Sequence, residues 1–247
     1  KNRPKKLINA PYHLNASVKS LRKYIDQKNL RSGLKIYTSL NPLAQKELED
    51  ALRRGSSYLR VRYQGDKSKY AKRTSYAGIT VDTKTGKVVA MVGGRNFKDS
   101  EFNRAMYTRR QMGELILPVL AAVNIERGEH LYTPLNPQLK NSIIHFDLLR
   151  GKKSYELASL ASRFGFGATH QLIRKSGVKV KRKDMSLLLG QEKLSLYQLA
   201  HLYALFSSEG NKLPKLEFVE RVLDPTGKEI ISFNRSKFEK RVIKKET

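Results

Sequence analysis

The chain has 247 residues, 39% of them hydrophobic and 9% aromatic, enough to build the core of one large domain or two small ones. Its 49 Lys and Arg against 22 Asp and Glu give a formal net charge of +27, which predicts attraction to polyanions. No apolar run could span a membrane, no signal-peptide pattern follows Lys1, and the lack of Cys excludes disulfides and thiolate metal sites.

The basic residues are spread along the whole chain and are densest at Lys1–Lys6, Lys67–Arg73 and Lys179–Lys183. Nucleic acid, anionic lipid headgroups and anionic wall polymers are all attracted to such a surface. No aromatic and basic RNP signature and no helix-turn-helix pattern accompanies the clusters, so no specific nucleic acid is expected. Two interpretations stay open: a merely solvated basic surface, and functional contact with an anion.

The chain is expected to begin with the end of a linker and a short amphipathic helix. Lys1–Lys6 holds four cations and a Pro and cannot pack. Val18, Leu21, Tyr24 and Ile25 then follow a helical spacing of apolar residues. These four side chains should therefore lie on one face of the helix.

A strand and a longer helix are predicted next. Gly33–Asn41 alternates like a strand, and Asn41-Pro42 predicts a helix with an Asn cap and Pro at its first position. The helix is expected to end near Gly55. Tyr58–Ala71, which is basic and rich in Tyr, is assigned to a loop or a weak edge strand.

The middle of the chain predicts a β-hairpin followed by a buried helix. Tyr76–Asp82 and Lys87–Gly94 are apolar strands joined across the turn Thr83–Gly86, and later strands are expected to complete their antiparallel sheet. Leu115–Val123 is an apolar run that should form the buried helix, with Gly128 as its stop signal.

The stretch from Phe102 to Val123 carries a family signal. It contains Asn103-Arg104-Ala105 and then Arg110-Gln111-Met112-Gly113-Glu114-Leu115-Ile116-Leu117-Pro118. This resembles the active-site segment of penicillin-binding transpeptidases, in which Asn-Arg-Ala leads to Arg-Gln-Pro-Gly-Ser-x-x-Lys-Pro. Ala10-Pro11-Tyr12 likewise resembles the connector that follows the glycosyltransferase domain of class A penicillin-binding proteins.

The resemblance implies that two catalytic positions are degenerate. In the family, the Ser is acylated by the stem peptide or by penicillin, and the Lys, on the same helical face, helps to remove its proton. Aligned on Gly113 and Pro118, the Ser position holds Glu114 and the Lys position holds Leu117. Glu forms no such acyl-enzyme, and Leu accepts no proton. Glu114 is then a salt-bridged or capping residue favoured by the helix dipole, or a new catalytic carboxylate.

The remaining family boxes are also degenerate or misplaced. In the Ser-x-Asn box the Ser is matched by Ser162, but the Asn position holds Phe164, which has no amide. Lys84-Thr85-Gly86 spells the third box, but it precedes the nucleophile position, so it is interpreted as a turn. Three further Ser-x-x-Lys matches are attributed to chance, because none precedes a long apolar helix; they begin at Ser20, Ser32 and Ser176.

The last third of the chain follows the family in Met185–Gly190 and Leu194–Ser207, where Gln198 replaces an acidic residue. Helical segments are expected in Ser154–Ser176, and a second hairpin is expected between Phe218 and Ile231. The stretch that would carry the genuine Lys-Thr-Gly box is absent, and cropping and an early natural end both remain open. Two apolar helical faces are predicted: Leu157, Leu160, Ala161 and Phe164, and Leu196, Leu199, Ala200, Tyr203 and Phe206.

The resemblance implies an α/β (α+β) three-layer sandwich of the penicillin-binding protein and β-lactamase type, with an antiparallel sheet, helices on both sides and an incomplete C-terminus. Residues 1–33 would be a linker after an upstream glycosyltransferase domain, and residues 34–247 the transpeptidase-like domain. No cofactor or metal is expected, since the five His lack ligand spacing.

Three functions are carried forward. The first is a catalytically inactive scaffold in peptidoglycan synthesis, at the periplasmic face of a membrane and anchored by a segment outside this sequence. Its expected partners are peptidoglycan or its precursors, an anionic membrane surface, or other cell-wall proteins. The second is a basic polyanion-binding module on the same fold, and the third is relocated chemistry around Glu114.

Overall fold

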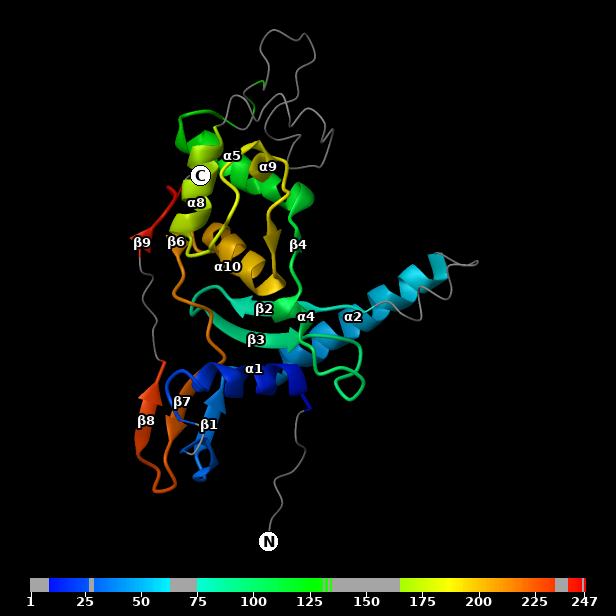
Figure 1. Cartoon of the computed structure of the whole chain (residues 1–247), viewed down its shortest axis with the longest axis vertical. Helices are drawn as coiled ribbons and strands as arrows, with labels where there is room; N and C mark the ends of the chain where they lie inside the picture. Colours follow the sequence, from blue (N-terminus) through cyan, green and yellow to red (C-terminus); the bar gives the residue numbers. More distant parts are fainter. Residues whose placement is uncertain are drawn as a thin grey trace. The chain divides into compact units, whose positions relative to one another are not determined.

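A computed structural model describes residues 9–26, 29–62, 75–130, 132, 134, 165–233, 240–245 and 247 (Figure 1). The chain forms two compact units. Unit 1 comprises Lys1–Thr108 with Pro214–Lys237, and unit 2 comprises Arg109–Leu213 with Phe238–Thr247. The basic clusters Lys1–Lys6 and Lys67–Arg73 lie outside the described residues.

Unit 1 combines helices with two antiparallel sheets. One sheet has the order β1-β7-β8, and the other is the hairpin β2-β3. Helix α2 packs on β2 and β3, and α1 packs on β3 and β7. The elements are α1 (Pro11–Leu21), η1 (Asn29–Arg31), β1 (Lys35–Thr38), α2 (Pro42–Arg62), β2 (Gly78–Asp82), β3 (Lys87–Val92), α4 (Arg104–Tyr107), β7 (Val219–Leu223) and β8 (Glu229–Ser232).

In the described residues, the predicted completion of the first sheet by later strands is limited to an isolated parallel bridge between Lys87 and Glu217. Strands β7 and β8 pair with β1, and β2-β3 stays two-stranded. The reason is that the free edge of β3 is already satisfied. The carbonyl of Val88 accepts from His13 Nε2 and from Ser39 Oγ, both at 2.7 Å, and the carbonyl of Val89 accepts from the backbone N–H of Asn41. Groups paired in this way offer no template for another strand.

Helix α1 is present as predicted, but only half of its predicted face is buried. Leu21 and Ile25, just beyond the helix, are in the core, whereas Val18 and Tyr24 are exposed. Tyr12, His13, Ala16 and Ser17 are buried instead. The spacing of four between buried positions is helical, but it includes polar side chains that hydrophobicity alone does not select.

Helix α2 begins as predicted and ends later than predicted. Asn41 Oδ1 accepts from the N–H groups of Leu43 and Ala44, at 3.0 and 3.1 Å, which caps the first turn. The helix then continues through Gly55 to Arg62, so the loop or edge strand assigned from Tyr58 onward is wrong up to that point. Gly55 is not among the glycines with positive φ, and a Gly in helical geometry weakens a helix without ending it.

Both predicted hairpins are confirmed. The turn after β2 is held by Asp82, whose carboxylate accepts from Lys84 N–H and from Thr85 Oγ1 at 2.9 and 2.8 Å. Although burial alone would raise the pKa of Asp82, these hydrogen bonds hold the pKa below its ordinary value. In the second hairpin, Asp224 binds Thr226 and Lys228 in the same manner.

Unit 2 is mainly helical, with two short antiparallel ladders, β4-β5 and β6-β9. Its elements are β4 (Arg110–Gln111), η2 (Gly113–Ile116), α5 (Leu117–Glu126), α8 (Phe166–Lys175), α9 (Met185–Leu188), β5 (Lys193–Leu194), α10 (Leu196–Ser207), β6 (Asn211–Lys212) and β9 (Lys240–Arg241). Helix α5 packs on α8, and α8 packs on α9. The helical segment expected up to Ser176 is therefore present as α8, while its apolar face at Leu157–Phe164 lies outside the described residues.

The buried central helix and its stop are confirmed. Leu117 and Val119–Val123 are buried, and the helix ends before Gly128, which has a φ of 92°. Leu115 is the exception, because it lies in the preceding 3-10 turn, with 46% of its surface exposed.

The face predicted for α10 is confirmed only in part, because Leu199, Tyr203 and Phe206 pack against the apolar cluster of unit 2. Its buried residues are His201, Leu202, Ala204 and Leu205, whereas Leu196 is exposed. The other four predicted residues, Leu199, Ala200, Tyr203 and Phe206, are only partly buried. Because this helix is apolar on most sides, periodicity alone does not select the side that packs in unit 2.

His13 should make the stability of the fold pH-dependent. It is fully buried, and burial lowers its pKa against the opposing hydrogen bond to Val88. Since the unfolded chain then binds the proton more readily, the free energy of unfolding should fall as pH drops below about 6.5, by up to about 1.4 kcal/mol per pH unit. Urea unfolding between pH 5 and 8 measures this slope. His13→Gln should flatten it, and an unchanged slope in this variant would contradict the assignment to His13.

Candidate functional site

The Asn-Arg-Ala segment is held against the end of β3 by close backbone packing. Asn103 is buried and caps α4, and its Nδ2 lies 3.1 Å from Met91 Sδ. The N–H of Arg104 donates to the carbonyl of Gly93 at 3.0 Å. A Cβ on Gly93 would lie 2.6 Å from Asn103 Oδ1. Gly93 and the Asn-Arg-Ala motif thus pack closely against each other within unit 1. Close packing is a sufficient structural reason for the residues at both places.

In unit 2, a short ladder fixes the backbone at the former nucleophile position. Arg110 and Gln111 pair with Leu194 and Lys193. Beyond this ladder, Met112 N–H donates to Glu192 O at 3.0 Å, and Gly113 N–H donates to Gly190 O at 2.9 Å. The turn that carries Glu114 is therefore anchored by main-chain hydrogen bonds, which depend little on side-chain identity.

Gly113 and Gly190, which are hydrogen-bonded to each other just beyond this ladder, should differ in how well they tolerate a side chain. Both have positive φ, 54° at Gly113 and 66° at Gly190, so Ala at either position should cost about 1 to 2 kcal/mol of left-handed strain. A Cβ on Gly113 meets nothing within 4 Å, whereas one on Gly190 would lie 2.1 Å from Gly113 O. Gly190→Ala should therefore destabilise by about 1 to 3 kcal/mol more than Gly113→Ala. Equal midpoints of urea unfolding would contradict this.

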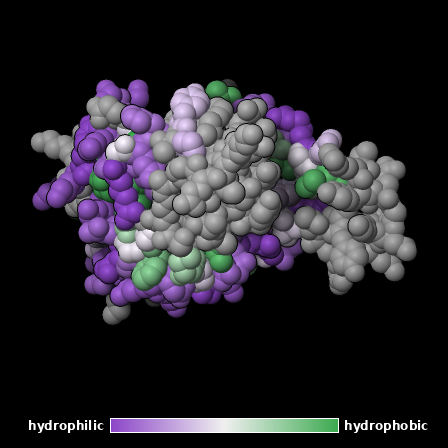
Figure 2. All heavy atoms as spheres, turned by 90° about the horizontal axis from the view of Figure 1, so that it is seen from above, coloured by the Kyte–Doolittle hydropathy of each residue, from purple (hydrophilic) through white to green (hydrophobic). Residues whose placement is uncertain are grey.

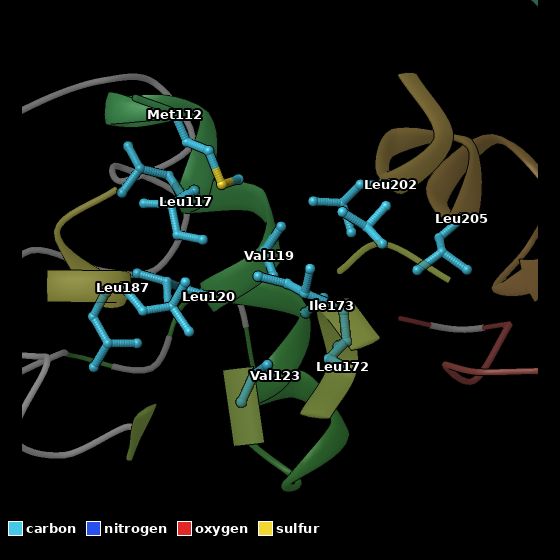
Figure 3. Close-up of a cluster of buried hydrophobic side chains, with 14 of the residues drawn as sticks. Met112, Leu117, Val119, Leu120, Val123, Leu172, Ile173, Leu187, Leu202 and Leu205 are labelled. Carbon is cyan, nitrogen blue, oxygen red and sulfur yellow. The ribbon is translucent and has the colours of Figure 1, made fainter. Parts of the chain in front are cut away.

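The two degenerate catalytic positions have opposite environments. Glu114 is exposed in the 3-10 turn η2, and its side chain makes no hydrogen bond or ion pair among the described residues. The salt-bridged role expected for it is therefore not seen there. Leu117 is 4% exposed and belongs to the main apolar cluster of unit 2. Figure 3 shows it near Met112, Leu120 and Leu187. Because the side chain at position 117 lies in this apolar core, it cannot bring a charged amine to the side chain at position 114.

Tyr203 is a titratable residue whose side chain contacts this turn. Its hydroxyl donates to the carbonyl of Leu115 at 2.7 Å. Burial raises the pKa of Tyr203, so the phenol stays protonated at neutral pH and is no general base. Ser162 and Phe164, the other degenerate positions, lie outside the described residues.

The chance Ser-x-x-Lys matches have structural roles. In each, the Ser hydroxyl donates to a nearby backbone carbonyl: Ser20 to Ser17 and Ser32 to Asn29 at 2.7 Å, and Ser176 to Ile173 at 2.6 Å. These hydroxyls therefore stabilise helix ends and turns. Lys84-Thr85-Gly86 is likewise the turn described above.

Two sets of polar interactions in unit 2 were not predicted from the sequence. Glu192 is buried, and its Oε2 accepts from the N–H groups of Lys181 and Arg182 at 3.1 and 2.9 Å. No sequence pattern marks this long-range contact. Ser195 and Gln198 form a reciprocal capping box at the start of α10. The Ser-x-x-Gln spacing could have found that box, and it gives Gln198 a structural reason.

Two further features concern the described part of the chain, namely metal ligands and membrane-spanning helices. No group of three or more His, Asp or Glu side chains there is placed to hold a metal ion. In the same residues, no helix is both long and apolar enough to cross a bilayer.

Known proteins resemble this chain in sequence and in fold. Penicillin-binding protein 1B of Vibrio cholerae is 27% identical over 240 residues, which cover 87% of this chain and 30% of that protein. PonA1 of Mycobacterium tuberculosis superposes with a TM-score of 0.75 at 19% identity, over 97% of this chain and 67% of that one. The relatives of this chain are class A penicillin-binding proteins. Penicillin-binding protein 1A of Haemophilus influenzae agrees, with a TM-score of 0.74 at 17% identity, over 90% and 50% of the two chains.

These comparisons confirm the family resemblance and the α+β transpeptidase-type fold with antiparallel sheets. The structural likeness, at 17% and 19% identity, concerns the fold alone. No protein-family model matches the sequence. The chain spans less than a third of the Vibrio protein, over the region that resembles the transpeptidase domain.

Proposed function

We propose that residues 34–247 form a transpeptidase-like domain without acyl-transfer chemistry, which serves as a scaffold or interaction module in peptidoglycan synthesis. Homology to class A penicillin-binding proteins over 87% of the chain supports the role in peptidoglycan synthesis. In this proposal the domain lies on the periplasmic face of the membrane. It follows a glycan polymerase, and its anchor lies outside the present sequence.

One observation carries the proposal: the position of the catalytic Lys holds a buried core residue. Leu117 packs in the apolar cluster of unit 2, while Glu114, three residues earlier, is exposed. Nucleophile and base act as one unit, so losing both removes the reaction rather than slowing it slightly. The backbone around positions 114 and 117 remains ordered, which supports a role for the folded domain that does not depend on catalysis.

The test is polymerisation by the full-length gene product. Membranes carrying it are supplied with a lipid-linked disaccharide precursor, and glycan chains are measured with and without penicillin. Penicillin should leave polymerisation unchanged, whereas deletion of residues 34–247 should reduce it. Undiminished polymerisation after the deletion, at equal protein level, would contradict the scaffold role.

A second candidate is a polyanion-binding module, for which the charge of +27 is the observation. Figure 2 shows hydrophilic side chains over most of the described surface on the face in view. Sequence read upstream of Lys1 separates the candidates: a membrane segment with glycosyltransferase motifs favours the first, and a nucleic-acid-binding domain favours the second. Relocated chemistry at Glu114 has no supporting partner among the described residues.

A further inference from the structure

The basic cluster at residues 179–183 lies in the segment that joins α8 to α9 in unit 2 (Figure 1). From residue 178 to residue 183 burial alternates, so that every second side chain is exposed. The exposed side chains are three lysines, here called the lysine row: Lys179, Lys181 and Lys183. The proposed function gives these lysines no role.

The lysine row is held on an ordered backbone. Val178 belongs to the apolar cluster of unit 2, and Val180 packs against that cluster. The buried carboxylate of Glu192 accepts through Oε2 from the N–H groups of Lys181 and Arg182, at 3.1 and 2.9 Å. Because the residues between the lysines are anchored to the core, the three ammonium groups are left on the outer side of the segment.

The charge of this segment is mostly uncompensated. None of the ion pairs between described residues includes a lysine of the row. Arg182 adds a fourth positive charge, and its Nη1 donates to Ser186 Oγ at 2.8 Å. Asp184 is the acidic residue of the segment, and its carboxylate accepts from the N–H and the hydroxyl of Ser186 at the start of α9. Four cations and one carboxylate give residues 178–184 a net charge of +3.

Two exposed apolar side chains follow the lysine row. Met185 comes two residues after Lys183 and is 41% exposed, and Leu189, one helical turn later, is 42% exposed. The N–H of Leu189 donates to the carbonyl of Met185 at 3.3 Å, which places the two residues on one side of α9. Leu187 and Leu188, between them, are buried. Cations next to exposed apolar side chains are typical of surfaces that lie at a lipid interface.

We propose that the lysine row, with Met185 and Leu189, is a docking surface for an anionic lipid bilayer. Anionic headgroups supply the charge opposite to the lysines, and the boundary with the acyl chains removes the two apolar side chains from water. A soluble polyanion offers the charge and no apolar interior, so the apolar pair favours the bilayer. The inference rests on the proposed function for its membrane, which that function places beside this chain.

The probe is a vesicle of phosphatidylglycerol and phosphatidylcholine in equal parts, sedimented with the 247-residue chain at about 0.15 M salt. The test variant combines Lys179→Gln, Lys181→Gln and Lys183→Gln. It should bind these vesicles about 100-fold more weakly, which corresponds to roughly 1 kcal/mol for each lost cation. The substituted side chains are exposed, so the Tm of the variant should stay unchanged.

The matched control removes the same charge from three exposed lysines of unit 1, by Lys46→Gln, Lys98→Gln and Lys228→Gln. It should keep vesicle affinity within about threefold, since only diffuse attraction to the basic surface is lost. Equal weakening in the two triple variants would overturn the site, because the whole basic surface would then bind the vesicle. This measurement needs no polymerase, so its failure is distinct from a failure of the scaffold role.

The apolar pair separates a bilayer from a soluble polyanion. Met185→Gln with Leu189→Gln should weaken vesicle binding about tenfold and leave binding to long-chain polyphosphate unchanged. Leu14→Gln with Val18→Gln is the control, since these side chains are 41% and 40% exposed and also one turn apart on a helix. This control should change neither. Vesicle binding that is unaffected by the Met185 and Leu189 changes would overturn the bilayer and indicate a soluble polyanion.

Discussion

Incubation with a fluorescent penicillin should leave the mass of this chain unchanged. The position that is acylated in the family holds Glu114, and the position of the proton-accepting Lys holds Leu117, buried in the core. Removing a nucleophile from a unit that acts jointly costs on the order of 10⁶-fold in rate. The three hydroxyls in chance Ser-x-x-Lys matches already donate to backbone carbonyls. Intact mass spectrometry measures the result.

A control variant separates loss of the nucleophile from loss of the base. Glu114→Ser restores a hydroxyl at an exposed position, where the fold should tolerate it. With Leu117 still in place this variant should also remain unlabelled, because nothing takes the proton. A transpeptidase with intact Ser-x-x-Lys serves as the positive control. A stoichiometric adduct on any native Ser would show that the alignment on Gly113 and Pro118 is wrong.

The sequence predicted the parts of the fold that local chemistry determines. Asn41 before Pro42, Asp82 and Asp224 at the hairpin turns, and Gly128 after the central helix all act within a few residues of their own position. Each uses a side-chain cap or a left-handed Gly whose pattern is readable from the chain. The family motifs placed these parts in order, and the structural comparisons agree.

What the sequence did not predict depends on contacts distant along the chain. His13, Ser39 and Asn41 bond to backbone carbonyls of β3, and hydrophobic alternation carries no signal for these contacts. At the candidate site, alignment named Leu117 as degenerate, and only the structure shows that it is a core residue.

Leu117→Lys, which restores the family residue, should destabilise unit 2 by about 4 to 5 kcal/mol at pH 7. The side chain at this position is 4% exposed and belongs to the apolar cluster that also contains Met112, Leu120 and Leu187. A fully buried Lys has a pKa lowered by about 3 to 5 units from about 10.4. At pH 7 such a Lys must lose its proton in the folded state, which costs about 1.4 kcal/mol for each of the roughly three pH units between 7 and 10.4. Leu115→Lys is the matched control, two residues away and 46% exposed, and should change stability by about 0.5 kcal/mol or less.

Urea unfolding at several pH values distinguishes this mechanism from a simple packing defect. Below the ordinary pKa of Lys, the unfolded chain takes up a proton that the buried site resists, so the deficit of Leu117→Lys should grow as the pH is lowered from about 10.4. A packing defect, as in Leu117→Ala, should cost about 2 to 5 kcal/mol at every pH. Equal, small effects of Lys at 115 and 117 would mean that the position is open to solvent. The pseudoenzyme proposal would then lose the observation that carries it, because a Lys could return there without disturbing the core.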